Sequence, residues 1–239
     1  NIFFKNSDDD ILFINKIYKS EFYYDSNSLE NILTSKNEIF NIPFALTIEN
    51  DKFNKEADAI FESSKIRLNI KNKTNYEGTD KLGLLDILFI NKSTSLNYQI
   101  KKNSLSFNSE KSNNGYDGRI DFKPFYLSAN FDYKGLSTKN LINQNSIFID
   151  FIQTNILNSK NLNAKNNINV NDITNNDELN SLLLNISIDQ GVIGFSGSNI
   201  MWKDACKIIL SESVLSYDGE EIDLIGKLIF DFEDINNIY

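Results

Sequence analysis

Residues 221–232 read Glu-Ile-Asp-Leu-Ile-Gly-Lys-Leu-Ile-Phe-Asp-Phe and show the pattern that recurs through this chain. Side chains on a β-strand point alternately to its two faces. The even-numbered positions are apolar or glycine: Ile222, Leu224, Gly226, Leu228, Phe230 and Phe232. The odd-numbered positions are mostly charged, with Ile225 and Ile229 as exceptions. A period of two over this length predicts a strand with one apolar and one polar face.

The same alternation returns in many short runs that are separated by clusters of Asn, Asp, Ser and Gly. Two further examples are the sets Phe40, Ile42, Phe44, Leu46, Ile48 and Leu182, Leu184, Ile186, Ile188. We therefore expect a mainly β fold, built as a long curved antiparallel sheet. The expected form is an open, groove-like meander.

Several local features refine this expectation. Residues 11–18 and 21–24 are expected to form the first pair of strands. Turn residues predict tight connections at 101–103, 113–118, 189–191 and 218–219. Pro43 predicts an edge strand or a bulge, because proline cannot donate to a β-ladder. Within residues 120–133 the apolar face switches at Pro124, which predicts a second bulge.

Residues 136–160 depart from the strand pattern. Their apolar side chains recur at spacings of three and four: Leu136, Leu141, Ile142, Ile147, Phe148, Phe151, Ile152 and Ile156. Ser137 and Thr138 are suitable N-cap residues. The segment predicts one or two short amphipathic helices, which either cover an end of the sheet or act as a lid or membrane-dipping helix.

The whole of residues 1–239 is expected to be a single β-rich region. A weak subdivision separates a β meander at 1–133 from a helix and C-terminal sheet at 134–239. The chain's one methionine is Met201, and strand-like sequence is already present at residues 1–4. We therefore expect a fragment of a longer protein.

Composition narrows the classes of function. The 239 residues include 41% hydrophobic side chains, which suffices for a core, and carry a formal net charge of −9. Phosphate binding requires a basic face, so the charge argues against nucleic acid. It also disfavours docking on anionic membranes through charge alone. Cys206 has no partner for an intrachain disulfide and is expected to be a small buried hydrophobe.

The sequence offers little chemistry for catalysis. It has no histidine, which removes the most common general base and histidine-ligated metals. Residues 191–197 are glycine-rich but lack the Gly-Lys-Ser/Thr ending of a phosphate loop. Residues 8–10 are three aspartates without the ligand spacing of a calcium loop. Alternation places Glu221 and Asp223 on the polar face beside Lys227. Contact with solvent is enough to explain charged residues at these positions. We expect no catalytic, cofactor-binding or metal-binding residues, and no enzyme.

The C-terminal part resembles the C-terminal region of AsmA-like bacterial envelope proteins, the AsmA/TamB type. The likeness is carried by residues 191–203, where glycines alternate with apolar residues, and by the Tyr-Asp-Gly…Ile-x-Leu-x-Gly pattern of 217–226. The expected helix at 136–157 and the segment 162–170 also follow that layout. The resemblance covers mainly residues 130–239, and it supplies no catalytic signature.

The resemblance implies a periplasmic protein anchored to the inner membrane of a Gram-negative bacterium through a segment outside this chain. AsmA-like relatives fold as long curved antiparallel sheets with an apolar concave face. They are linked to phospholipid transport, envelope maintenance and outer-membrane biogenesis. The implied partners are phospholipid acyl chains and the membrane. No cofactor is implied, and protein partners stay open.

These observations give two hypotheses of different classes. The first is a non-enzymatic segment that handles or transports phospholipid along an apolar groove, with contacts to acyl chains from Ile222, Leu224, Leu228, Phe230 and Phe232. The alternative is a structural or adhesive β domain of a secreted or surface protein, with its apolar faces packed into a closed core. Whether the apolar face is open or covered separates them. Gly226, among bulky neighbours, is expected to mark a bend or a close approach of another backbone.

Overall fold

The computed structural model describes residues 1–5, 9, 11–76, 81–89, 92–109, 114–137, 159–217 and 222–232. Every regular element in these ranges is a β-strand, so the predicted mainly β class is confirmed. The chain divides into two compact units. The first comprises the described residues within Asn1–Glu110 and Arg119–Phe125, and the second those within Lys111–Gly118, Tyr126–Gln153 and Leu157–Tyr239.

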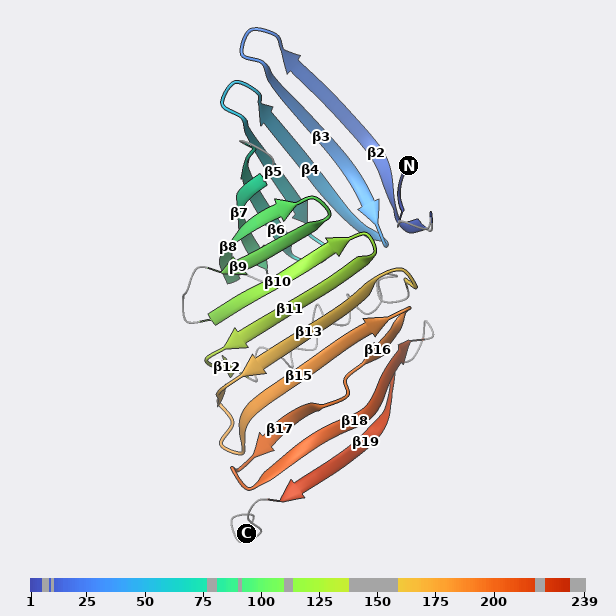
Figure 1. The fold of residues 1–239 in the computed structure, drawn as a ribbon, viewed down its shortest axis with the longest axis vertical. Coiled ribbons are helices and arrows are strands. Elements are labelled where there is room, and N and C mark those ends of the chain that lie inside the picture. Colours follow the sequence, from blue (N-terminus) through green and yellow to red (C-terminus); the bar gives the residue numbers. More distant parts are fainter. Residues whose placement is uncertain are drawn as a thin grey trace. The chain divides into compact units, whose positions relative to one another are not determined.

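The first unit is an antiparallel meander in which consecutive strands pair with one another (Figure 1). Its strands are β1 (Ile2–Lys5), β2 (Ile11–Asp25), β3 (Glu30–Ile39), β4 (Ile42–Asp51), β5 (Glu56–Ser63), β6 (Leu68–Asn75), β7 (Lys81–Phe89), β8 (Lys92–Lys101) and β9 (Ser104–Ser109). Short turns join most of them, including the predicted turn after Lys101. The expected meander is therefore present from the first strands.

The register of the first unit aligns a row of apolar residues on one side of the sheet. Leu46 of β4 lies opposite Phe61 of β5, which lies opposite Ile70 of β6, and Ile70 lies opposite Ile87 of β7. The other side carries charged rows, for example Asp58 opposite Lys73. Direct pairs on a face are neighbours in space, so alternation in each strand adds up to two distinct faces. We call the apolar one the first apolar face.

The second unit is built from the later strands. They are β13 (Asn163–Val170), β15 (Leu179–Asp189), β16 (Val192–Gly194), β17 (Ser198–Trp202), β18 (Cys206–Tyr217) and β19 (Ile222–Phe232). Two further strands, β10 (Asn114–Phe122) and β11 (Phe125–Tyr133), carry residues of both units. The predicted turn at 189–191 joins β15 to β16, with positive φ at Gln190 and Gly191. The turn predicted at 218–219 lies outside the described residues.

One pairing in the second unit departs from the antiparallel expectation. β11 and β13 run parallel, with Leu127 opposite Ala164 and Phe131 opposite Ile168. A parallel pair requires a crossover that returns the chain to the starting end. The short strands β12 (Leu136–Ser137) and β14 (Ile173–Thr174) are also parallel and form a small separate sheet.

The predicted helix is wrong at its first two residues. Leu136 and Ser137 form β12, and the Leu136 backbone N–H donates to the Asp172 carbonyl at 2.9 Å. Pairing with β14 thus gives these backbone groups partners across the sheet. The rest of the predicted helix, at 138–158, lies outside the described residues.

Three local predictions also need correction. Residues 11–18 and 21–24 are not a pair but one strand, β2, with a register irregularity between Ile17 and Lys19. Residues 114–118 are strand rather than turn, and the turn comes at Lys123-Pro124 between β10 and β11. Pro124 therefore marks a hairpin, not a bulge. Proline suits a turn because it fixes φ and needs no donor partner.

Pro43 lies in a central strand, against the prediction of an edge or bulge. β4 pairs with β3 on one side and β5 on the other. The backbone ladder with β5 begins only at Ala45, so the ladder partner of Pro43 is Glu38 of β3. On the β5 side the Pro43 carbonyl accepts a hydrogen bond from Ser63 Oγ at 2.7 Å. Proline is tolerated there because no bond to β5 is lost.

The described residues contain a small core. Their buried apolar side chains are Leu12, Ile42, Leu96, Tyr98, Ala129, Ala164, Val170, Ile173, Ile193, Ala205 and Cys206. Most apolar residues on the two sheets are half-buried or exposed. Face-to-face packing of two sheets would bury these side chains more fully. Each unit therefore holds its apolar residues on a single layer of strands.

Candidate functional site

The candidate site begins on β19, where register confirms the predicted strand face. Leu224, Leu228, Phe230 and Phe232 lie opposite Leu215, Leu210, Ile208 and Cys206 of β18, and Ile222 lies opposite Tyr217. Solvent exposure is 48–61% for four of these side chains: Leu224, Leu228, Phe230 and Phe232. The side chain of Ile222 is not among those that the structure describes. The structure thus brings the five predicted residues into one row, and four of them are open.

The row continues across the second unit. Ile208 lies opposite Ile200 of β17, which lies opposite Leu182 of β15, and Leu182 lies opposite Val170 of β13. Further apolar members are Leu184, Ile186, Ile188, Ala164, Ile168, Leu127, Ala129 and Phe131. One polar residue, Asn166, lies among them, opposite Ala129 and Ile186. We call this surface the second apolar face. Sequence reasoning predicted the apolar face for 222–232 and for the set Leu182, Leu184, Ile186 and Ile188. It did not predict this alignment, which depends on pairing partners distant in the chain.

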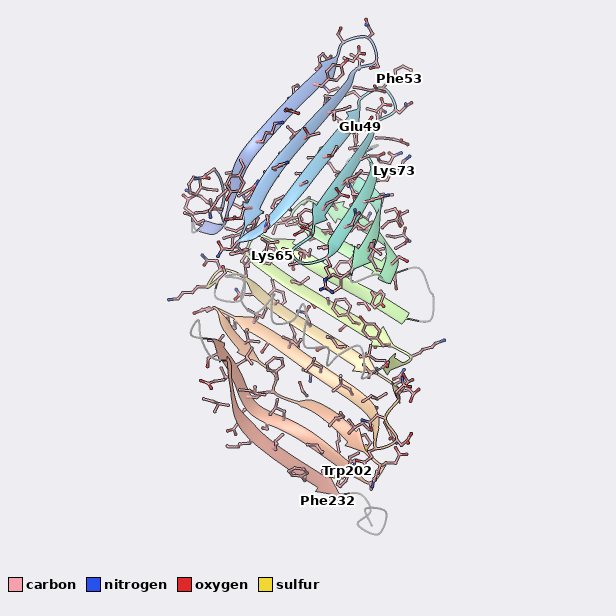
Figure 2. The ribbon with its side chains drawn as sticks, turned by 180° about the vertical axis from the view of Figure 1, so that it is seen from behind. Glu49, Phe53, Lys65, Lys73, Trp202 and Phe232 are labelled. Atoms are coloured by element: carbon pink, nitrogen blue, oxygen red, sulfur yellow. The ribbon has the colours of Figure 1, made fainter. Side chains whose placement is uncertain are left out.

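Trp202 marks one end of the second apolar face. It pairs with Cys206, which pairs with Phe232, so the three residues form one row across β17, β18 and β19. Figure 2 shows Trp202 and Phe232 at the same end of the strands. The rings of Phe230 and Phe232 stack with centroids 6.4 Å apart. Cys206 is fully buried, as predicted for a small hydrophobe.

Gly226 confirms the predicted close approach. β18 places two residues, Glu212 and Ser213, opposite it, because the register shifts between Ser211 and Val214. A Cβ on Gly226 would lie 2.8 Å from Ser213 Cβ and 3.1 Å from Ser213 Cα. Ser213 cannot move freely, since its N–H donates to Ser196 Oγ at 3.2 Å. The glycine therefore accommodates a bulge in the neighbouring strand.

The other end of the second apolar face is more enclosed. Val170 and Ala129 are almost fully buried. Tyr133 packs against Tyr116 with ring centroids 5.5 Å apart. Burial, with a smaller contribution from Tyr116, raises the pKa of Tyr133 to about 12. The face thus passes from a packed end to an open strand at β19.

The opposite face of the second unit is polar and rich in amides. Asn167 donates to Asn130 at 2.9 Å, and Asn130 donates to Asp117 at 3.0 Å. An open cavity of about 580 Å3 lies over this row, with Asp132, Asn169, Leu183 and Asn185 as further lining residues. Amides and carboxylates of this kind offer hydrogen bonds. They do not form a nucleophile with an adjacent base.

The first apolar face contains a polar cluster that sequence reasoning missed. Tyr98 is buried, and its hydroxyl lies 2.5 Å from Thr74 Oγ1 and donates to Asn72 Oδ1 at 2.7 Å. Its ring lies directly over Gly83 of β7, in the place that a Cβ would take. A glycine within an alternating strand, opposite an aromatic residue, was the available signal. This signal can be interpreted only when it is known that β7 pairs with β8.

No protein-family model matches this chain, nor does any curated protein or solved structure. Within the described ranges, no group of three His, Cys, Asp or Glu side chains could hold a metal ion. No helix there is long and apolar enough to cross a membrane. What the described geometry offers is a largely apolar surface on one layer of strands, interrupted at Asn166, which suits contact with an apolar ligand.

Proposed function

We propose that this chain is a non-enzymatic, lipid-handling segment that holds phospholipid acyl chains against the second apolar face. The observation that carries the proposal is the row on β19, where Leu224, Leu228, Phe230 and Phe232 share one face and stand about half exposed. Large exposed apolar patches generally mark interaction surfaces. Acyl chains fit because burial alone contributes about 0.8 kcal/mol per methylene, with no polar ligands required.

The continuity of the face supports the same proposal. Apolar residues of β19 meet those of β18, β17, β15, β13 and β11 in register, so a long apolar ligand would meet no charged side chain among these row members. Strands of about ten residues at roughly 3.3 Å each are about 30 Å long. That length is comparable with the hydrocarbon core of a bilayer, about 30 Å.

The sequence resemblance to AsmA-like proteins supplies the setting of the proposal. On that basis the segment belongs to a periplasmic protein, anchored to the inner membrane by a part of the protein outside this chain. Its role is movement or holding of phospholipid during envelope maintenance. The sheet architecture is compatible with this setting, and the polar faces leave the outer side of the sheet for water.

Two double variants on one strand test the proposal. Leu228→Asp with Phe230→Asp places charge on the apolar row, whereas Ile225→Asp with Ile229→Asp places the same charge on the opposite face of β19. Purified wild-type protein is expected to carry phospholipid, measured by mass spectrometry of extracted lipid. The first double variant should lose most of that lipid and the second should keep it.

Denaturant unfolding of both variants completes the experiment. Both are expected to stay within about 1 kcal/mol of the wild type, since all four side chains are exposed. A wild type without lipid, or equal lipid loss in both variants, contradicts the proposal. If only the first variant fails to fold, the row is core and the structural alternative is correct.

A further inference from the structure

A charged turn lies at one strand end of the second apolar face. β17 ends at Trp202, residues 203–205 form the turn, and β18 begins at Cys206. The ammonium of Lys203 lies over the Trp202 ring, with Nζ 5.6 Å from the ring centroid. Trp202 belongs to the row that continues through Cys206 to Phe232. The turn therefore places a cation beside the apolar row at the end of these strands.

Hydrogen bonds and packing hold this turn in place. The Lys203 N–H donates to the Glu178 carbonyl at 2.7 Å, and the Ala205 N–H donates to the Trp202 carbonyl at 3.0 Å. Ala205 is fully buried. Lys203 and Asp204 both have positive φ, a conformation that is uncommon outside glycine and suits a tight turn. The backbone under Lys203 is thus fixed, and the outer part of its side chain can move to meet a ligand.

Glu178 supplies the opposite charge beside this turn. Its Oε1 lies 3.7 Å from Lys203 Nζ, and the side chains of Glu178 and Lys203 are 62% and 37% exposed. An ion pair this open to solvent contributes little to folding stability. The ammonium has three donors, so it can bind a further anion while it stays near the carboxylate. The pair therefore offers a positive and a negative group side by side to a ligand.

The position of this ion pair suits the headgroup of a phospholipid. A tryptophan ring has an apolar body and a polar N–H, and such rings favour the boundary between hydrocarbon and water. A lipid with its acyl chains on the apolar row and its headgroup at Trp202 would have its phosphate near Lys203. At the opposite strand end, the turn of residues 189–191 reads Asp-Gln-Gly and brings no cation (Figure 1).

The charges at the turn also select among headgroups. Glu178 and the exposed Asp204 place two carboxylates near one ammonium, which disfavours a headgroup with a net negative charge. The headgroup of phosphatidylethanolamine carries one phosphate and one ammonium. If it lies antiparallel to the ion pair, its phosphate meets Lys203 and its ammonium meets Glu178.

We propose that the turn at residues 203–205, together with Glu178, binds the zwitterionic headgroup of an aminophospholipid. The acyl chains of this lipid extend from Trp202 over the second apolar face. This site rests on the proposed function, to which it adds a headgroup class and a direction for the bound lipid.

Paired ligands and paired variants test the headgroup site. The probes are dihexanoyl phosphatidylethanolamine and dihexanoylglycerol, which have the same acyl chains, and their Kd values are measured by isothermal titration calorimetry. The wild type should bind the phospholipid about fivefold more tightly. Lys203→Met keeps the length of the side chain and should remove this preference while leaving the diacylglycerol Kd unchanged. Lys207→Met removes the same charge from the polar face of β18, opposite Met201 and Asp231, and should keep the preference.

A third probe separates zwitterionic from anionic headgroups. Glu178→Gln should weaken binding of dihexanoyl phosphatidylethanolamine and should not weaken that of dihexanoyl phosphatidylglycerol, which has no ammonium. Equal binding of phospholipid and diacylglycerol by the wild type, or a preference that survives Lys203→Met, would overturn the headgroup site while acyl-chain binding stands. Tighter binding of phosphatidylglycerol than of phosphatidylethanolamine would also overturn it. No binding of any of the three probes would overturn both this site and the proposed function.

The direction of the bound lipid has its own readout. Two phosphatidylethanolamines are compared, one brominated near the carboxyl end of its acyl chains and the other near the methyl end. Trp202 fluorescence should be quenched more strongly by the first lipid, because the site places the headgroup at Trp202. Stronger quenching by the second lipid would overturn the proposed direction.

Discussion

β4 in the first unit and β19 in the second have nearly the same sequence pattern but different surroundings. Large apolar residues recur at every second position in both strands: Phe44, Leu46 and Ile48 in β4, and Leu228, Phe230 and Phe232 in β19. The β4 residues are half-buried, whereas those of β19 are exposed. β4 is paired with β3 and β5, and β19 is paired with β18. Alternation thus decides which face a residue occupies, but it does not decide how exposed that residue is.

The largest expected effect comes from the same substitution in the two strands. Leu46→Asp should lower the free energy of unfolding by roughly 2–4 kcal/mol, because it removes packing against Phe61 and places a charge on a half-buried surface. Leu228→Asp should cost about 1 kcal/mol or less, since Leu228 is 61% exposed. Chemical denaturation of the two variants measures both. Equal losses would show that the difference in exposure between the two strands does not set the cost of the substitution.

A smaller effect is expected where β19 does have a tight contact. Gly226→Val should destabilise by roughly 1–3 kcal/mol, because the new side chain meets the Ser213 backbone at the bulge. Gly115→Val in β10 is the matched control, since a Cβ there meets Asp132 only at an ordinary 3.7 Å. An unchanged denaturant midpoint for Gly226→Val would show that the bulge yields and that β19 is open along its full length.

The smallest effect concerns pH at the enclosed end of the second apolar face. The folded pKa of Tyr133 is raised to about 12, against about 10 for an ordinary tyrosine, mainly by burial. The stabilisation is therefore present below about pH 10 and is lost as the pH rises through about 12. The denaturant midpoint should fall less in Tyr133→Phe than in wild type between pH 9 and pH 11.5. Identical falls would mean that this end is as open as β19.

Part of this fold could be predicted from the sequence. The face of each residue in 222–232 and the close approach at Gly226 followed from alternation and from a glycine among bulky neighbours. Residues 11–25 were read as two strands because polar residues interrupt the apolar pattern, and the register irregularity near Tyr18 resets which side is apolar. The parallel β11–β13 pair could not be predicted, since local periodicity carries no information on strand direction.

The candidate site, too, could be predicted only in part from the sequence. The members of the β19 row could be named from the sequence, but their exposure could not, because it depends on how the rest of the fold packs around them. The buried cluster of Tyr98, Thr74 and Asn72 was also beyond local reasoning. Asn72 and Thr74 lie two positions apart on β6, and Tyr98 lies on β8. Only the pairing of β6, β7 and β8 brings the three residues together.

The central claim, that the second apolar face holds acyl chains, is tested most directly through Trp202. It is the chain's one tryptophan and belongs to the row with Cys206 and Phe232. Phospholipid brominated in its acyl chains should quench Trp202 fluorescence on binding. A control protein with Trp202→Phe and Asn199→Trp carries the indole on the opposite face of β17 and should be quenched far less. Equal quenching of both proteins, or no quenching of Trp202 while lipid is bound, would contradict the account.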